Sequence, residues 1–391
     1  MKHSPSQSTS AKQSSKKIII AAAGSRKTTS LVEIAIASSN KRILILTYTI
    51  DNLKQINDCF VQKCGFVPEH VSIQTWFAFL LRDCVRPYQS YMYSGPRIES
   101  LRFVPSRSTK WIKKSDVNRY YIHGNRHIYS DKISEFACLC NAKSGSNHVM
   151  RRLEKIYDLI LIDEIQDMAG YDFDLFQLLL ESSIDIVMVG DNRQATYFTN
   201  CSPKYNRYKG KSIIDLFKDF EGRNLCSIEY RTECYRCNQE ICTFADRLYP
   251  GMPKTLSRNS ATSGHDGVFG VPVVDLSAYV ANYSPKILQH DKRSHTHGYD
   301  AMNFGVVKGQ TFDRVLIFPT KAMETFLEMG GPSELKDATR AKLYVAITRA
   351  KYSVAFVLED NRFGAMLKRT NTDRVIVDEL KDGKHVSTDN R

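Results

Sequence analysis

The sequence has no long apolar run, and this absence excludes a membrane-spanning helix. Even its longest apolar runs, such as Ile18–Ala23, are only the length of a strand, whereas a membrane span needs about 20 consecutive apolar residues. The first residues are rich in Ser, Gln and Lys and have neither the apolar stretch nor the cleavage site of a signal peptide. We therefore expect a cytoplasmic protein with no membrane partner.

The cysteines also lack the regular spacing of a disulfide framework. There are ten in 391 residues, which favours reduced thiols in a cytosolic protein. Cys234 and Cys237 have the spacing of half a zinc site, but no second pair follows at the usual interval. We interpret His290, His295 and His297 as solvated loop residues, and no zinc site is expected.

Acidic residues are in the minority. The chain has 42 Asp and Glu against 55 Lys and Arg, a net charge of +13, which favours a polyanionic partner such as nucleic acid. Residues 82–155 hold 15 basic and 6 acidic residues, so most of the excess lies there. A solvated face is the alternative interpretation.

Aromatic residues are interleaved with the charges of this segment, as in surfaces that stack bases and bind phosphates. They are Tyr88, Tyr91, Tyr93, Trp111, Tyr120, Tyr121 and Tyr129. The expected phosphate contacts are Lys110, Lys113, Lys114 and Arg119. The segment therefore predicts a nucleic-acid surface.

Short β-branched runs alternate with amphipathic segments, which predicts α/β domains with buried parallel sheets. The expected strands are Lys17–Ala21, Arg42–Leu46, Asp158–Ile162, Ile184–Val189, Val271–Leu276, Arg314–Phe318 and Ser353–Leu358. Residues 17–81 and 156–222 are expected to form a first domain, 82–155 a basic insert in it, 223–391 a second domain and 1–16 a disordered tail.

The segment Ala21–Thr29 joins a small-residue loop to a Lys-Thr pair at the start of a helix. In such a P-loop the backbone N–H groups face the phosphates, the lysine reaches the β- and γ-phosphates and the hydroxyl holds Mg²⁺. Lys27 and Thr28 are the candidates for these two tasks. The other residues expected at the nucleotide are Ala23, Gly24, Ser25, Arg26 and Thr29.

A second motif, Asp158–Met168, is an apolar strand that ends in two carboxylates. An Asp-Glu pair at a strand end is often only a helix cap, but here it follows a P-loop. Phosphoryl transfer needs one carboxylate for Mg²⁺ and one to orient or deprotonate water. Asp163 is the candidate for the metal and Glu164 for the water.

The strand Ile184–Val189 leads into a third box, Gly190-Asp191-Asn192-Arg193-Gln194-Ala195-Thr196-Tyr197. The three motifs together resemble the UvrD/Rep group of superfamily 1 helicases, which has a P-loop, a DEXQD box and a GDxxQ-x-x-Y box in this order. Further boxes of the family resemble Thr47–Thr49, Gln74–Phe77, Glu229–Thr232, Val307–Asp313 and Tyr344–Ala350. The short chain looks most like the compact UvrD-like helicases of phages and bacterial defence islands.

The resemblance implies two RecA-like P-loop NTPase domains, with ATP and Mg²⁺ as ligands. It implies that Gln194 senses the γ-phosphate, that Arg231 and Arg349 act on it as arginine fingers, and that Tyr230 stacks on the adenine. Gly309 is a further nucleotide contact by the same resemblance. The implied contacts with the nucleic-acid strand are Thr47, Thr49, Thr75, Trp76, Tyr197 and Phe198.

The implied activity is ATP-driven translocation or unwinding on single-stranded DNA in the 3′ to 5′ direction, although the sequence does not separate DNA from RNA. About fifty residues lie between Pro250 and Asn303, too few for the family's second accessory domain. The alternative function is a nucleotide-gated, nucleic-acid-binding subunit with weak or lost hydrolysis, which regulates a nuclease-containing and antiviral complex.

Arg26 departs from the family pattern, because it occupies the position of a P-loop glycine. Glycine adopts backbone conformations that cost other residues roughly 1 to 3 kcal/mol. We expect Arg26 to obstruct the loop, so that Arg26→Gly raises the rate of hydrolysis. If the arginine instead supplies charge to the phosphates, the same change is expected to weaken nucleotide binding.

Overall fold

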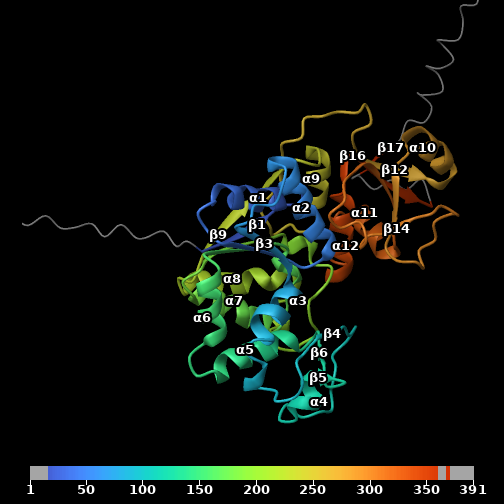
Figure 1. Cartoon of the computed structure of the whole chain (residues 1–391). Coiled ribbons are helices and arrows are strands. Elements are labelled where there is room, and N and C mark those ends of the chain that lie inside the picture. Colours follow the sequence, from blue (N-terminus) through green and yellow to red (C-terminus); the bar gives the residue numbers. More distant parts are fainter. Residues whose placement is uncertain (1–15, 360–366, 370–391) are drawn as a thin grey trace, which may run out of the picture. The chain divides into compact units, whose positions relative to one another are not determined.

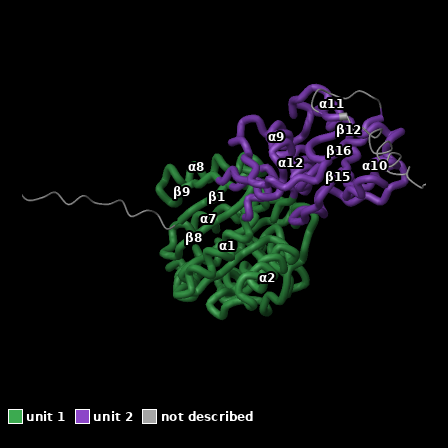
Figure 2. Tube along the Cα trace, turned by 90° about the horizontal axis from the view of Figure 1, so that it is seen from above, with its two compact units in different colours: residues 1–20, 27–192, 197–230 green, residues 21–26, 193–196, 231–391 purple. Residues whose placement is uncertain are grey.

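The computed structural model describes residues 16–359 and 367–369, which form two compact units (Figure 2). Within these residues, unit 1 comprises 16–20, 27–192 and 197–230. Unit 2 comprises 21–26, 193–196 and the described residues from 231 onward. In this part of the chain no helix is long and apolar enough to span a membrane. The expected disordered tail lies outside the described residues, except for Lys16.

Unit 1 is built on a six-stranded sheet with the strand order β3-β2-β7-β8-β1-β9. The strands are β1 (Lys17–Ala21), β2 (Ile43–Thr47), β3 (Val71–Thr75), β7 (Leu159–Ile162), β8 (Asp185–Gly190) and β9 (Ser227–Arg231). The pairs β2–β3, β2–β7, β7–β8 and β1–β8 are parallel. The carboxyl ends of β1, β2, β7 and β8 therefore lie at one edge, which is where the predicted motifs follow the strands.

Helices complete the core of unit 1. They are α1 (Lys27–Ala37), α2 (Ile50–Cys64), α3 (Trp76–Phe79), α7 (Asp172–Glu181) and α8 (Ile213–Gly222). The residues at the two ends of α2 explain where this helix begins and ends. The Thr49 hydroxyl accepts a hydrogen bond from the Asn52 N–H at the start, and Gly65 takes a left-handed conformation at the end.

The basic segment 82–155 folds as part of unit 1. It contains a small sheet of β4 (Ser100–Arg102), β6 (His127–Tyr129) and β5 (Ile122–His123), and the helices α4 (Val117–Tyr121), α5 (Ile133–Lys143) and α6 (His148–Ile156) (Figure 1). Tyr93, Tyr120 and Tyr121 are buried in the core of the unit. The expectation that these three rings stack on bases is wrong, because they pack the interior instead.

Unit 2 has a second six-stranded parallel sheet with the order β14-β13-β15-β16-β12-β17. Its strands are β12 (Gly267–Pro272), β13 (Lys286–Gln289), β14 (Met302–Asn303), β15 (Phe312–Phe318), β16 (Ala350–Leu358) and β17 (Lys368–Arg369). Its helices are α9 (Gln239–Asp246), α10 (Leu276–Tyr283), α11 (Lys321–Met329) and α12 (Asp337–Ile347), and β10 (Glu233–Cys234) pairs with β11 (Leu256–Ser257). The predicted class, α/β with two RecA-like domains and parallel sheets, is confirmed.

One predicted strand of unit 2 is displaced. The expected strand Val271–Leu276 is in fact β12, Gly267–Pro272. Proline fixes its φ and has no N–H for the sheet, and the chain turns immediately after Pro272 into a 3-10 turn and then helix α10. The apolar residues that suggested a strand belong partly to this turn.

A buried histidine makes the stability of unit 2 sensitive to acid. The His265 ring is stacked between Phe269 and Tyr283, with centroid distances of 4.0 and 3.8 Å, and its Nε2 lies 3.0 Å from the Tyr279 hydroxyl. Burial, followed by the nearby charge of Arg314, lowers the pKa of His265 to about 4. The folded state therefore favours the neutral ring.

We predict that unit 2 loses stability as the pH falls from about 6.5, the pKa of an unfolded histidine, towards 4. The loss from this group approaches about 3 kcal/mol once both pKa values have been passed. His265→Phe keeps the aromatic stack and removes the titration, so its acid unfolding, followed by circular dichroism, is expected at lower pH than that of the wild type. Equal acid midpoints for the two proteins would show that His265 titrates normally.

Candidate functional site

The phosphate loop follows β1 and is compact. The Ser25 N–H donates to the Ala22 carbonyl at 3.3 Å, and Gly24 has φ +72°. A Cβ on Gly24 would lie 2.8 Å from both the Arg236 Cβ and the Cys234 Sγ, so only glycine fits. The Ser25 hydroxyl is buried and has no hydrogen-bond partner in the structure, and an orphaned donor in such a loop suits an anionic ligand.

Arg26 has the backbone conformation of the glycine that it replaces. Its φ is +60°, in the left-handed region that costs a non-glycine residue roughly 1 to 2 kcal/mol. Glycine adopts this conformation more easily than other residues do. The loop thus keeps its shape in spite of the arginine.

The side chain of Arg26 lies on an aromatic ring. Its guanidinium carbon is 4.2 Å from the centroid of the Tyr235 ring, and the Tyr235 hydroxyl donates to Glu233 at 2.8 Å. The Tyr235 N–H donates to the Gly24 carbonyl at 2.9 Å, so Tyr235 is on the carbonyl side of the loop. P-loops face phosphates with their N–H groups. This geometry argues against the obstruction that the sequence led us to expect.

We therefore predict that Arg26→Gly changes ATP turnover by less than about threefold, because the backbone is already glycine-like. Tyr235→Ala is expected to change turnover or ATP affinity more than Arg26→Gly does, since it frees the guanidinium from the ring. Steady-state hydrolysis of both variants and of the double variant tests this. A large rise in turnover for Arg26→Gly alone would restore the obstruction hypothesis.

The two predicted Mg²⁺ ligands touch each other. The Thr28 hydroxyl, in the first turn of α1, donates to Asp163 Oδ2 at 2.9 Å, across a large distance in sequence. Burial, with the adjacent charge of Glu164, raises the pKa of Asp163 to about 6, and the charge of Lys27 opposes this rise. A hard cation with oxygen ligands suits such a crowded pair of carboxylates. The residues present thus fit Mg²⁺.

Glu164 is held in an unusual backbone conformation beside Asp163. Its φ and ψ are +57° and +39°, the left-handed region, and such strain is common at functional positions. The Gln166 side-chain amide donates to the Glu164 carboxylate, and its Oε1 accepts the Asp191 N–H at 3.0 Å. Gln166 therefore links the second and third boxes. No role was expected for Gln166 from the sequence, although it is the letter Q of the DEXQD pattern.

Two of the three residues assigned to the γ-phosphate, Gln194 and Arg349 of unit 2, are also hydrogen-bonded to each other. Arg349 Nη2 donates to Gln194 Oε1 at 3.1 Å, and both side chains are buried. The same guanidinium donates to the carbonyls of Val345 and Gln310 at 3.1 and 3.3 Å. Its position is thus fixed by several partners.

The remaining predicted nucleotide residues lie near strand ends and turns. Tyr230 ends β9 with Arg231, and 46% of the Tyr230 surface is exposed, as a ring that receives a base requires. Gly309 has φ +87° in the turn before β15. Ala23 is buried, whereas Thr29 belongs to the first turn of α1.

The predicted contacts with a nucleic-acid strand divide into two groups. Trp76 is fully buried and its indole N–H donates to Asp172 at 2.8 Å, and Thr47 is fully buried as well. The prediction that these two side chains contact nucleic acid is wrong, since neither has an accessible surface. Tyr197 and Phe198 are 47% and 39% exposed, which leaves both rings available for stacking.

The two other predicted strand contacts, Thr49 and Thr75, have structural tasks in unit 1. Each is the residue before a helix, and its hydroxyl accepts a backbone N–H of the first turn, from Asn52 and Ala78 respectively. Both remain half-buried. Their hydroxyls are therefore occupied, and their contact with nucleic acid stays a prediction.

The chain is similar to two known protein families. Residues 140–358 match the viral superfamily 1 RNA helicase core domain, and residues 6–200 match an AAA domain. The first match alone covers more than half of the sequence. The chain belongs to the superfamily 1 helicases, as the motifs predicted.

Among curated proteins, the chain is similar to two that are called probable DNA helicase II homologs. That of Mycoplasma pneumoniae is 27% identical over 245 residues, which cover 57% of this chain and 31% of that protein. That of Mycoplasma genitalium is 24% identical over 142 residues, 35% of this chain and 19% of that protein. The chain thus spans less than a third of the length of these relatives.

Solved structures of viral helicases are similar at low identity. Arterivirus nonstructural protein 10 (helicase) is 15% identical with a TM-score of 0.44, covering 90% of this chain and 62% of that one. The PRRSV helicase is 16% identical with a TM-score of 0.42, covering 89% of this chain and 53% of that one.

Proposed function

We propose that the protein is an ATP-dependent translocase or helicase that acts on single-stranded DNA in the 3′ to 5′ direction. The observation that carries this proposal is the contact between Thr28 and Asp163, with Lys27 and Glu164 next to them in sequence. Only the fold brings these residues together, and they are the set that MgATP hydrolysis requires. The DNA preference and the direction rest on the resemblance to the UvrD/Rep group.

The proposed division of labour follows from the contacts. Lys27 neutralises charge on the β- and γ-phosphates, and Thr28 and Asp163 hold Mg²⁺, which when bound offsets the charge of the triphosphate. Glu164, oriented by Gln166, accepts a proton from the attacking water. Gln194 and Arg349 serve the γ-phosphate, Arg231 assists, and Tyr230 receives the adenine.

One exposed segment of the basic insert fits a nucleic-acid contact. Trp111 is 96% exposed and stands between the exposed Lys110 and Lys113. A free aromatic face flanked by cations can stack a base and hold phosphates. By contrast, Lys114 pairs with the buried carboxylate of Glu135, and Arg119 lies 3.7 Å from Asp116.

We predict that the double change Lys110→Gln and Lys113→Gln weakens single-strand binding and reduces the slope of log affinity against log salt by about one for each lost phosphate contact. Lys114→Gln is the matched control. It should lower stability more than affinity, since it leaves Glu135 buried without its partner. Fluorescence anisotropy over a salt series measures both the affinity and its dependence on salt. If the double variant binds single strands like the wild type, the segment is a solvated face and not a nucleic-acid surface.

The rate of ATP hydrolysis with and without single-stranded nucleic acid tests the proposed function. We expect turnover to rise on addition of single-stranded DNA, and an RNA of the same sequence tests the preference. Directional movement is then measured by displacement of a protein block from either end of the strand. If ATP hydrolysis is absent both with and without nucleic acid, the proposal that the protein is an ATP-driven motor is wrong.

A second candidate function is a nucleotide-gated subunit that binds ATP and nucleic acid with little turnover and regulates a nuclease partner in an antiviral complex. The left-handed Arg26 in the phosphate loop favours it, because a strained residue stands where the family has glycine. ATP binding without hydrolysis in the wild type, together with a rise in turnover in Arg26→Gly, would support this function.

A further inference from the structure

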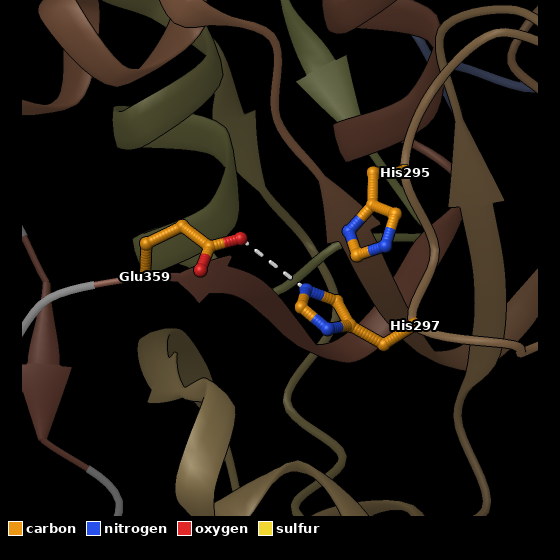
Figure 3. Close-up of side chains that lie close together, drawn as sticks. All are labelled: His295, His297 and Glu359. Atoms are coloured by element: carbon orange, nitrogen blue, oxygen red, sulfur yellow. Dashed lines mark ion pairs between the residues drawn. The ribbon is translucent and has the colours of Figure 1, made fainter.

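The structure assigns a transition-metal site to His295, His297 and Glu359 in unit 2 (Figure 3). One ligand atom of each side chain lies within 4.8 Å of one of each of the others. His297 Nε2 is 3.3 Å from a Glu359 carboxylate oxygen, and the two imidazole centroids are 4.3 Å apart. The two histidines belong to the loop between β13 and β14, whereas Glu359 directly follows β16.

The distances agree with a small tetrahedral ion. Bonds of about 2.0 to 2.1 Å from zinc to nitrogen or oxygen place neighbouring ligand atoms about 3.3 Å apart. The His297–Glu359 distance already has this value. The His295 ring is exposed, so a rotation of its side chain is enough to bring one of its nitrogens to the same distance from the other ligand atoms.

The donor set selects the class of metal. Two imidazoles and one carboxylate suit Zn²⁺ or Co²⁺, whereas Mg²⁺ and Ca²⁺ prefer oxygen ligands. Three protein ligands leave a fourth position for water or for another ligand. The site would thus bind Zn²⁺ with an open coordination position.

The surroundings orient one of the ligands. The ring of Phe318, at the end of β15, lies against the His297 ring at 6.0 Å with an interplanar angle of 29°. His297 is only 22% exposed, and its Nε2 points towards Glu359 (Figure 3). A packed ring needs less ordering when it binds a metal than a free one does.

This site is distinct from the proposed nucleotide residues of unit 2. Arg349 directly precedes β16 and Glu359 directly follows it, with nine residues of strand between them. At about 3.3 Å per residue, the two lie roughly 30 Å apart. The ion would therefore fasten the β13–β14 loop to the end of β16, and it is not the Mg²⁺ of ATP.

The test is a titration of the full-length, chelator-treated protein with Zn²⁺ by calorimetry, and with Co²⁺ by visible absorption. We expect one saturable equivalent, a tetrahedral Co²⁺ spectrum and a rise in the melting temperature of the wild type, since an ion that binds only the folded state stabilises it. His295→Ala, His297→Ala and Glu359→Gln should each weaken binding at least tenfold. Without metal, the melting temperatures of His295→Ala and Glu359→Gln should match that of the wild type, because both side chains are exposed.

His290→Ala is the matched control. This neighbouring histidine pairs with Asp291 at 3.1 Å and does not belong to the cluster, so the variant should bind Zn²⁺ like the wild type. The proposal fails if no saturable binding occurs, which would leave His297 and Glu359 as a simple ion pair. It also fails if a variant that combines His295→Ala, His297→Ala and Glu359→Gln binds Zn²⁺ with wild-type affinity, which would point to the Cys234 and Cys237 thiols.

Discussion

Glu164→Gln is expected to lower ATP turnover by about 10²- to 10⁴-fold and to leave ATP binding within a few-fold of the wild type. General-base catalysis contributes a factor of this size, and glutamine cannot take a proton from the attacking water. The change preserves the local geometry, because the amide oxygen of glutamine can still accept the hydrogen bond that Gln166 donates. Turnover is measured under saturating MgATP, and binding by a fluorescent analogue.

Two further variants make this result specific. Lys27→Ala should lose ATP binding itself, since it removes the charge that faces the β- and γ-phosphates. Glu181→Gln removes a carboxylate of unit 1 that pairs with Arg223 instead, and should retain turnover. A Glu164→Gln protein that hydrolyses ATP within threefold of the wild-type rate would show that another group activates the water.

The strands that the sequence predicts well are those buried on both faces. β1 and β7 match the predicted ranges within one residue, because every position of such a strand is apolar or nearly so. β3 was not among the expected strands. It lies at the edge of the sheet and mixes buried and half-buried residues with the exposed Ser72, so that its five residues carry little apolar signal.

The motifs predicted some of the contacts between distant residues, but not how those residues are held. The order of the boxes implied that Thr28 and Asp163 meet, and they do. The ring of Tyr235 under Arg26 depends on a backbone hydrogen bond between segments far apart in sequence, which no local pattern reports. Trp76 shows the opposite error. A family motif suggested a strand contact, whereas the buried Asp172 carboxylate holds the indole inside the core.

The hydrogen bonds of the buried Asp172 carboxylate explain why the segment around Trp76 lies in the interior of unit 1. Besides Trp76, its carboxylate accepts hydrogen bonds from Ser134 of α5 and from Thr199. Burial raises the pKa of Asp172, while these hydrogen bonds oppose the rise. One buried carboxylate therefore ties the basic insert to the core of unit 1, an arrangement that composition alone cannot reveal.

Arg349→Ala is expected to lower turnover by about 10³-fold or more, the range measured for arginines that stabilise charge on a transferred phosphoryl group. The guanidinium has a fixed position, because it donates to Gln194 and to two backbone carbonyls. Arg349→Lys should recover little of the loss, since an ammonium lacks the planar fork. Since Arg349 and Gln194 are in contact, the losses from Arg349→Ala and Gln194→Ala should not add in the double variant.

The control for Arg349 separates catalysis from folding. Arg340 lies on α12, close in sequence to Arg349, and donates to the carbonyls of Pro332 and Leu335 at 2.9 and 3.2 Å. Arg340→Ala thus removes a similar set of structural hydrogen bonds without touching Gln194. We expect it to lower the melting temperature with turnover retained at low temperature, whereas Arg349→Ala should lose turnover even where it is fully folded. Equal loss of turnover in the two variants would reduce Arg349 to a structural residue.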